Sequence, residues 1–381
     1  MSNSELPKGW RECKLGDVAE ICSSKRIFAK EYVELGIPFY RSKEIIEKEL
    51  GIEIKNPLYI SATRFKEIKD IYGSPKDGDI LLSAVGERSG IPYLVANDGD
   101  FYFKDGNLIW LKNFNIATTS DFLYYWFKSE IGQNYLMNSM IGSAQRALTI
   151  QGIRGLEINL PPLAEQKAIA EVLSSLDDKI DLLHQQNQTL EDMAQTLFRE
   201  WFIEKADEGW EEVKLGDLIE PKKGKNITKK QAKGGDYPVV AGGLEPSCYH
   251  NDFNTKSPVV TISASGANAG YVRLYLSEVW SSDSSFIDST ITDYVYFFYI
   301  FLKINQQTLF DNQTGSAQPH IYPAQIMDLD LLNPPKDLML KFENIAKDIF
   351  SKIEINQKQI KSLEQTRDTL LPKLMSGQVR V

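Results

Sequence analysis

The stretch Leu160-Pro161-Pro162-Leu163 opens the segment that decides the architecture of this chain. Proline lacks a backbone donor and restricts the residue before it, so the pair stops any element arriving from the N-terminal side. From Leu163 to Phe202 there is neither glycine nor proline, and apolar residues recur every three to four positions, which predicts one amphipathic helix. At about 1.5 Å per residue it would be roughly 60 Å long, more than one small domain can bury. Such a helix requires a partner.

The composition indicates a soluble protein of two globular domains. The 381 residues exceed one ordinary core, and 42% hydrophobic with 25% charged residues is typical of folded soluble chains. The three cysteines and three histidines are scattered without metal-ligand spacing, so we expect no metal site and a reducing, cytoplasmic setting. The longest apolar run, Tyr294 to Leu302, is half of what a membrane span needs.

The net charge of −9 argues, taken alone, against a free-standing nucleic-acid binder. Totals hide local patches, however. Between Pro221 and Gly235 there is no acid, and six lysines occur there: Lys222, Lys223, Lys225, Lys229, Lys230 and Lys233.

The chain contains its own sequence twice. Gly9-Trp10 and Lys14-Leu15-Gly16-Asp17 recur 200 residues later, at Gly209-Trp210 and Lys214-Leu215-Gly216-Asp217. The tetrad Gly142-Ser143-Ala144-Gln145 recurs unchanged at Gly315-Ser316-Ala317-Gln318, and Pro161-Pro162 recurs at Pro334-Pro335, both at an offset of 173. The same offset of 173, applied to the first long helix, leads to a second amphipathic segment near the C-terminus. We therefore expect a first globular domain at 1–160, a long helix at 161–205, a second domain at 206–334, and a second long helix with a tail at 335–381.

We expect the two long helices to pair as an antiparallel coiled coil. Residues 161–207 carry four basic and ten acidic side chains, whereas 336–381 carry nine basic and six acidic ones, so the charges are opposite. Asn187 and Asn356 are placed to fix the register. The alternative is that each helix packs back on its own domain. The predicted pairing residues are Ile169, Leu176, Ile180, Leu183, Leu190 and Leu197, with Ile345, Ile349, Ile353, Ile360, Leu363 and Leu370.

Each globular domain has an α/β (α+β) pattern. Residues 80–85 and 91–95 predict a hairpin with a glycine-rich tip, mirrored by 259–263 and 271–275. A helix is predicted from 120 to about 140, paralleled by 292–315, and a strand at 156–160 or 329–332 closes each domain. The fold expected is thus a pseudo-two-fold internal repeat.

No motif for catalysis is present: the sequence has no phosphate-cradling loop, dinucleotide fingerprint, HExxH or nucleophile elbow. The tetrad Asn333-Pro334-Pro335-Lys336 resembles the Asn-Pro-Pro-aromatic motif of amino-group DNA methyltransferases, but Lys336 replaces the aromatic and no cofactor glycine motif precedes it. We interpret it as a linker.

Several motifs together resemble the specificity subunit of type I restriction-modification enzymes, over nearly the whole chain and in duplicate. These are Leu160-Pro161-Pro162-Leu163-Ala164-Glu165-Gln166-Lys167, the Gly-Trp and Leu-Gly-Asp starts, the Gly-Ser-Ala-Gln tetrads, and the tail Leu371-Pro372-Lys373-Leu374-Met375-Ser376-Gly377. The resemblance implies a non-catalytic prokaryotic DNA-recognition protein with two target-recognition domains separated by two antiparallel helices. It also implies two copies of an adenine methyltransferase subunit that uses S-adenosylmethionine, and an ATP-dependent, Mg-requiring restriction subunit that could join. No cofactor is expected on this chain itself.

Two readers at the ends of a rigid spacer predict a bipartite double-stranded DNA target with unread base pairs between its halves. Features that both units share should serve common tasks such as phosphate contact, whereas readout of each half-site should lie where the units differ.

The candidate DNA-binding residues follow from this rule. In the first unit they are Arg41, Lys43, Arg88, Gln145 and Arg146; in the second they are Lys222, Lys223, Lys225, Asn226, Asn268, Gln318 and His320. Arginine and asparagine fit base edges, whereas a lysine run fits phosphates. Each could equally be a solvated surface group unless the loops gather on one face. The competing hypotheses are a stand-alone adenine DNA methyltransferase using Asn333 and a coiled-coil scaffold without a DNA role.

Overall fold

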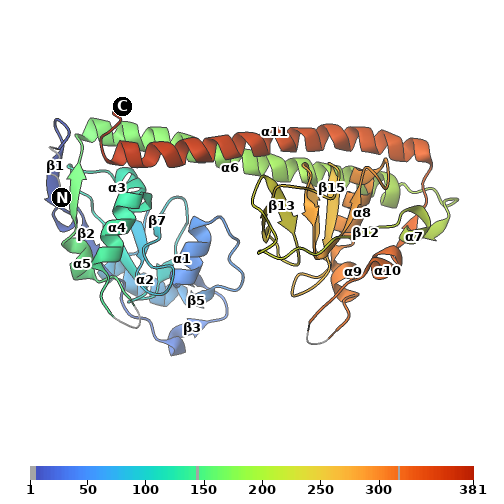
Figure 1. Ribbon diagram of the computed structural model, residues 1–381. Helices are drawn as coiled ribbons and strands as arrows, with labels where there is room; N and C mark the ends of the chain where they lie inside the picture. Colours follow the sequence, from blue (N-terminus) through green and yellow to red (C-terminus); the bar gives the residue numbers. More distant parts are fainter. Residues whose placement is uncertain (1–5, 143–145, 316–317) are drawn as a thin grey trace. The chain divides into compact units, whose positions relative to one another are not determined.

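The computed structural model describes residues 6–142, 146–315 and 318–381, and the chain divides into two compact units (Figure 1). The first unit comprises Met1–Ile180 and Ser362–Val381, and the second comprises Asp181–Lys361. Each unit therefore contains a globular part and one section of each long helix.

The described residues of the first unit form ten strands and five α-helices besides its sections of the long helices. The strands are β1 (Arg11–Lys14), β2 (Glu20–Cys22), β3 (Tyr32–Val33), β4 (Ile37–Tyr40), β5 (Leu58–Ile60), β6 (Ile80–Ser83), β7 (Pro92–Leu94), β8 (Tyr102–Phe103), β9 (Leu108–Lys112) and β10 (Glu157–Leu160). The helices are α1 (Ser42–Glu49), α2 (Ala62–Tyr72), α3 (Ser120–Lys128), α4 (Glu130–Ser139) and α5 (Ile150–Arg154).

The second unit repeats this plan with fewer elements. Its strands are β11 (Glu212–Lys214), β12 (Lys222–Lys223), β13 (Tyr237–Val240), β14 (Cys248–His250), β15 (Val259–Ser263), β16 (Val272–Tyr275), β17 (Trp280–Ser281), β18 (Ser284–Asp288) and β19 (Asp330–Leu332). Its helices are α7 (Leu215–Leu218), α8 (Val295–Ile304), α9 (Gln306–Asp311) and α10 (Pro323–Met327).

The four-stranded sheet and the two-stranded sheet of the first unit have counterparts of the same size in the second, whereas the smaller sheet has four strands in the first unit and three in the second. A four-stranded sheet runs β2-β9-β6-β7 in the first unit and β12-β18-β15-β16 in the second, with every pair antiparallel. A smaller sheet places β4 parallel to β8, and β13 parallel to β17. The first and last strands of each globular part pair as β1-β10 and β11-β19. The predicted hairpins 80–95 and 259–275 and the closing strands are confirmed.

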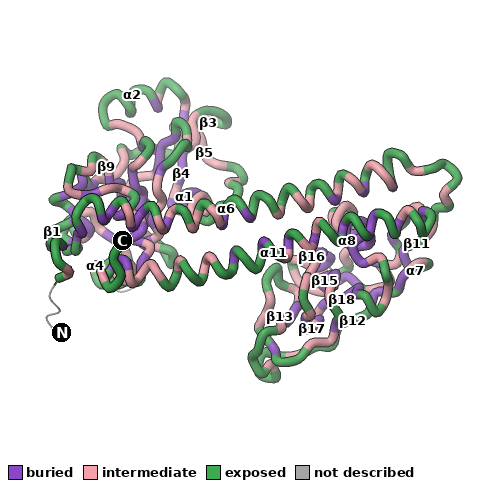
Figure 2. The backbone as a smooth tube through the Cα atoms, turned by 90° about the horizontal axis from the view of Figure 1, so that it is seen from above, coloured by how far each residue is buried: buried purple, intermediate pink, exposed green. Residues whose placement is uncertain are grey.

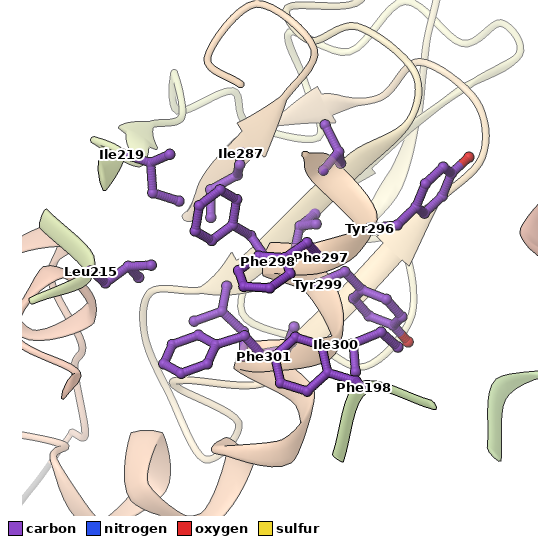
Figure 3. Packing of buried hydrophobic residues seen from close by; sticks show 14 of the residues in the cluster. Phe198, Leu215, Ile219, Ile287, Tyr296, Phe297, Phe298, Tyr299, Ile300 and Phe301 are labelled. Carbon is purple, nitrogen blue, oxygen red and sulfur yellow. The ribbon is translucent and has the colours of Figure 1, made fainter. Parts of the chain in front are cut away.

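One inner strand of each four-stranded sheet is fully buried, because other strands flank it and a helix packs on it, α1 on β6 and α8 on β15. Every residue of β6 and β15 is buried, as Figure 2 shows for β15. In the second unit the apolar helix α8 fills the core, and Figure 3 shows Phe297, Phe298 and Phe301 of this helix with Phe198 beside them. The rings of Phe198 and Phe297 lie 5.1 Å apart, so the long helix belongs to the same core as α8.

The predicted helices 120–140 and 292–315 are each broken into two. Ser129 ends α3 and begins α4, because its backbone is extended and its hydroxyl accepts a hydrogen bond from Gly132 N–H at 3.1 Å. Gly132 permits the sharp turn, since a Cβ there would lie 2.0 Å from Trp126 O. In the second unit Asn305 lies between α8 and α9. The junction residues themselves, Ser129 and Asn305, are neither glycine nor proline, so periodicity alone did not indicate the breaks.

The long helices are α6 (Leu163–Arg199), extended by a π-helical turn at Glu200–Glu204, and α11 (Lys336–Met375). In each unit their sections run antiparallel. In the second unit Asn187 contacts Asn356, and the rings of Phe198 and Phe342 lie 5.5 Å apart. In the first unit Arg367 contacts Asp177, and Arg380 of the tail contacts Glu165. Helix pairing within each unit agrees with the coiled-coil expectation.

Most predicted pairing residues are covered. The buried ones are Ile169, Ile180, Leu183, Ile353 and Ile360, and the half-buried ones are Leu176, Leu190, Leu197, Ile349, Leu363 and Leu370. Ile345 departs from the expectation because it is 40% exposed. The buried apolar positions of its turn are Phe342 and Ala346, which belong to the core around α8. No helix in the described part of the chain is long and apolar enough to cross a membrane.

Candidate nucleic-acid interface

In the first unit the tip of the β6–β7 hairpin lies against the segment that follows α4. Val85 forms an antiparallel bridge with Ala147, and Leu148 N–H donates to Ala84 O at 2.9 Å. Arg88 at the tip and Arg146 beside the bridge are both exposed. Two arginines far apart in the sequence therefore lie on neighbouring segments at one end of the sheet.

The second unit builds the same junction with different side chains. Ser265 bridges His320, and Gly266 N–H donates to Pro319 O at 2.9 Å. His320 Nδ1 lies 2.8 Å from Gln318 O, and its ring stacks on Tyr322. On the hairpin tip, Asn268 Nδ2 donates to Gly242 O at 3.4 Å.

The Arg41 to Lys43 segment joins this end of the first unit. Ser42 Oγ donates to Asn107 O at 2.6 Å, and Ala84 N–H at the hairpin donates to the same oxygen at 2.8 Å. The start of α1 is therefore held directly beside the hairpin.

The cations of this segment are partly neutralised. The Arg41 guanidinium forms an ion pair with Glu44, and this hydrogen bonding raises the pKa of Arg41. Lys43 Nζ lies 3.6 Å from Glu47. Arg88 and Arg146, by contrast, have no ion-pair partner within the described residues. They are the stronger candidates for a phosphate or a guanine edge.

Lys225 and Asn226 lie at the corresponding end of the second unit. Gly224 N–H donates to Ser284 O at 2.8 Å, and Lys225 N–H donates to Ser281 O at 2.9 Å. Ser284 in turn pairs with Ser263, the last residue of β15 before the hairpin tip. The segment after β12 is thus adjacent to the strand that carries the tip.

Lys222 and Lys223 lie in a strand and not in one loop with Lys225 and Asn226. They form the edge strand β12, opposite Phe286 and Ser285. Lys222 Nζ lies 3.5 Å from Thr290 Oγ1, beyond the far end of β18. Of the lysine run, Lys225 is therefore nearer to the hairpin tip than Lys222.

Lys25 and Arg26 also lie at this end of the first unit, although they are not among the residues that the sequence predicted. They follow β2 as Lys225 and Asn226 follow β12, and the preceding Ser24 Oγ donates to Phe103 O at 2.7 Å. Arg26 pairs with Asp105 at 2.7 Å, but its side chain is 67% exposed. The signal was available, because Glu20 and Lys25 recur at the offset of 200 as Glu220 and Lys225.

Five segments meet in each unit at this end of the sheet, which we call the reading end. In the first unit these segments are 23–26, 41–43, 86–90, 105–107 and the described parts 141–142 and 146–147, and in the second they are 224–226, 241–245, 265–270, 282–283 and the described parts 314–315 and 318–320. Gln145 lies outside the described residues.

The described residues hold no group of three or more His, Cys, Asp or Glu side chains that could bind a metal ion. Asn333, the candidate for methyltransferase chemistry, extends the β11–β19 ladder by donating its N–H to Glu211 O at 2.9 Å. Its place is that of a connector between β19 and α11.

Comparison with known proteins agrees with the duplicated architecture. The sequence model of the type I restriction modification DNA specificity domain matches twice, at residues 7–192 and 207–365. The type I restriction enzyme MjaIX specificity subunit of Methanocaldococcus jannaschii is 28% identical, over 99% of this chain and 95% of that protein. The HindI specificity subunit of Haemophilus influenzae is 24% identical, over 97% and 99%. The fold is similar to the crystal structure of a type I restriction-modification S subunit from M. genitalium, with a TM-score of 0.65 and 19% identity over 97% of this chain and 98% of that one.

Proposed function

The chain belongs to the type I restriction-modification DNA specificity family, and from this premise we propose that it selects a bipartite DNA sequence, with one half-site recognised by each unit. Specificity subunits are non-catalytic components, so the chemistry of methylation and cleavage belongs to other subunits. The family also leaves no role for Asn333 as a methyltransferase residue.

The observation that carries the proposal is the repeated reading end. The backbone hydrogen bonds that assemble it recur in both units, whereas the side chains on it differ: exposed Arg88 and Arg146 in the first unit, half-buried Asn268 and His320 in the second. Arginine pairs bidentately with guanine and asparagine with adenine. A shared frame with different side chains suits recognition of two different half-sites.

Phosphate contact is assigned to what the units share. Lys25 and Lys225 occupy equivalent places after β2 and β12 and lie at offset 200 in the sequence. A lysine ammonium is a compact point charge that binds phosphate without selecting a base. These lysines would add affinity that does not depend on sequence.

The long helices are assigned to the spacing between the half-sites and to docking of partner subunits. Two copies of a methyltransferase subunit would bring S-adenosylmethionine, and a restriction subunit would bring ATP and Mg. The net charge of −9 is compatible with DNA binding if the partners contribute basic surface around the phosphates.

The proposal is tested by the methylated sequence that the whole complex produces. Cells carrying this chain with its methyltransferase subunit would be sequenced by a method that detects N6-methyladenine directly. We expect two specified blocks separated by unspecified base pairs. In the variant Arg88→Ala/Arg146→Ala, one block should lose its sequence specificity, and in the variant Asn268→Ala/His320→Ala the other block should lose it. In a block that keeps its specificity, each mismatched base pair should still cost about 1–3 kcal/mol of binding free energy. A contiguous target, or changes in both blocks from one pair of substitutions, would contradict the proposal.

A further inference from the structure

One backbone position at the centre of each reading end carries a different side chain in the two units. In the first unit it is Asn107, whose carbonyl oxygen accepts from Ala84 N–H at 2.8 Å, and in the second it is Asp283, whose carbonyl oxygen accepts from Ala264 N–H at 3.1 Å. Each residue lies directly before the strand, β9 or β18, that pairs with the hairpin strand. The two residues are therefore equivalent in the internal repeat, and only their side chains differ.

Asp283 is accessible at a place where its neighbours are covered. From Ser281 to Asp288 every other residue is buried, whereas Asp283 is half-buried. Its Oδ2 accepts a hydrogen bond from the Ser265 hydroxyl at the hairpin tip. An ionised carboxylate has about four acceptor sites, so this single bond leaves acceptors for another partner. The carboxylate is thus oriented by the tip and still able to accept from a ligand.

The carboxylate of Asp283 lies among the candidate DNA-binding groups of the second unit. Ser265, its hydrogen-bond partner, forms the bridge with His320, and Lys225 N–H donates to Ser281 O two residues before Asp283. A carboxylate repels phosphates and by itself lowers the affinity of a surface for DNA. It is favourable on such a surface where it faces a donor on a base, and the N4 amino group of cytosine is the donor that aspartate accepts from.

Asn107 offers different chemistry at the same place in the first unit. It is half-buried as well, directly before the buried residues Leu108 to Leu111. Its carbonyl oxygen also accepts from Ser42 Oγ at 2.6 Å, so the backbone of Asn107 is fixed beside Arg41. A carboxamide carries both a donor and an acceptor, and these match the N7 and N6 groups of adenine.

We infer that Asn107 and Asp283 are specificity-determining residues that each read one base pair of a half-site. Asp283 accepts a hydrogen bond from N4 of a cytosine, and Asn107 pairs with N6 and N7 of an adenine, both in the major groove. The inference rests on the proposed function for the DNA target. Because the backbone position is the same in both units, exchanging the side chains should exchange the bases that they select.

Exchange of the two side chains in the whole complex tests this. The complex would be mixed with duplexes in which each base pair of the two wild-type blocks is randomised in turn, and the bound duplexes would be sequenced. In Asp283→Asn, one position of one block should change from C·G to A·T, with a preference of about tenfold or more. In Asn107→Asp, one position of the other block should change from A·T to C·G.

A third variant separates base reading from a purely structural role of Asp283. Ser265→Ala removes the hydrogen bond to the hairpin tip but keeps the carboxylate, so it should weaken binding without changing the preferred base. Matched controls are Asp236→Asn and Asn97→Asp, which are exposed, lie before β13 and after β7 at the opposite end of the sheets, and should leave both blocks unchanged. Thermal melts by circular dichroism check that every variant folds.

The outcomes distinguish this inference from the proposed function. Folded exchange variants that keep the wild-type preference, or that bind all duplexes equally more weakly, would overturn the inference and leave the proposed function intact. A changed base preference in Ser265→Ala would assign the readout to the hairpin tip and would also overturn it. A contiguous target for the wild-type complex would count against the proposed function itself.

Discussion

Asn356 donates its side-chain amide to the carboxamide oxygen of Asn187 at 2.9 Å, inside the helix pair of the second unit. Asn356 is fully buried, and its own Oδ1 has no partner within the described residues. A polar pair among apolar stripe positions lowers stability and restricts the helices to one register. The repeat places apolar Leu183 and Ile360 at the positions offset by 173, so the pair marks one unit.

Replacing Asn356 with leucine should therefore stabilise the second unit. Removing a buried acceptor that has no partner removes its desolvation penalty of about 1–3 kcal/mol. Asn187 is only half-buried, so its amide stays hydrated in the variant. Chemical denaturation measures the free energy of unfolding. Asn344→Leu, on the solvent face of the same helix, is the control and should change it by less than about 0.5 kcal/mol. A lower stability of the Asn356→Leu variant would contradict this account.

Glu343 should make the second unit less stable as the pH rises. Burial raises the pKa of Glu343 to about 7, although its carboxylate accepts hydrogen bonds from Tyr296 and Phe297 N–H at 3.0 and 2.9 Å. Because the folded pKa is above the unfolded value of 4.5, the folded state binds the proton more tightly. The resulting stability is complete below about pH 4.5 and is lost as the pH rises through about 7.

Melting temperatures of the wild type and Glu343→Gln between pH 5 and pH 8 check this. The free energy of unfolding of the wild type should fall by up to about 3 kcal/mol relative to that of the variant over this pH range, and the melting temperature should fall with it. Asp348→Asn, at an exposed position of α11, is the control and should melt in parallel with the wild type. Parallel curves for Glu343→Gln would rule out the titration.

Gln166 should be required for docking α6 on the first globular part. The fully buried amide donates to Ala117 O and Pro161 O at 2.8 and 2.9 Å, and its Oε1 accepts from Thr118 Oγ1 and Thr119 N–H. Gln166→Ala leaves these buried groups without partners and should cost about 2–3 kcal/mol.

Gln166→Glu should be at least as damaging, because a carboxylate cannot donate to the two carbonyl oxygens. Gln365→Ala, at an exposed position of α11 in the same unit, should be nearly neutral in the same unfolding experiment. Equal effects of Gln166→Ala and Gln365→Ala would show that the hydrogen bonds do not hold the helix.

Lys25 and Lys225 should contribute sequence-independent affinity. In each single alanine variant, binding of the complex to cognate and non-cognate duplexes should weaken by a similar factor, and the slope of log K against log salt should fall by about one. Fluorescence anisotropy across a salt series measures both. Lys230→Ala, exposed and outside the reading end, is the control. A selective loss for the cognate duplex would assign base readout to these lysines instead.

Insertion of seven residues into both long helices should lengthen the unread spacer of the DNA target. Inserts after Ile180 and after Lys361 fall at the boundaries between the two units and preserve the apolar stripe. Seven residues add about 10.5 Å of helix, equal to about three base pairs. Sequencing of the methylated adenines should show both half-sites unchanged. A changed half-site sequence would refute the spacer role.

The sequence by itself determined the plan of this protein. Two α/β units and two long helices followed from the proline pair, the uninterrupted apolar stripe and the two offsets of 200 and 173. This was possible because hydrophobic periodicity is a local property of the sequence, and an internal repeat is found by comparing the sequence with itself. The hairpins and closing strands followed from alternation and glycine-rich turns.

Only the tertiary structure decided which residues share a surface. The reading end joins segments that are distant in the sequence through backbone hydrogen bonds that the sequence does not encode locally, such as Ala84 N–H to Asn107 O and Leu148 N–H to Ala84 O. It also placed Lys222 in an edge strand and exposed Ile345, because neighbouring strands and helices determine which side of a residue is covered.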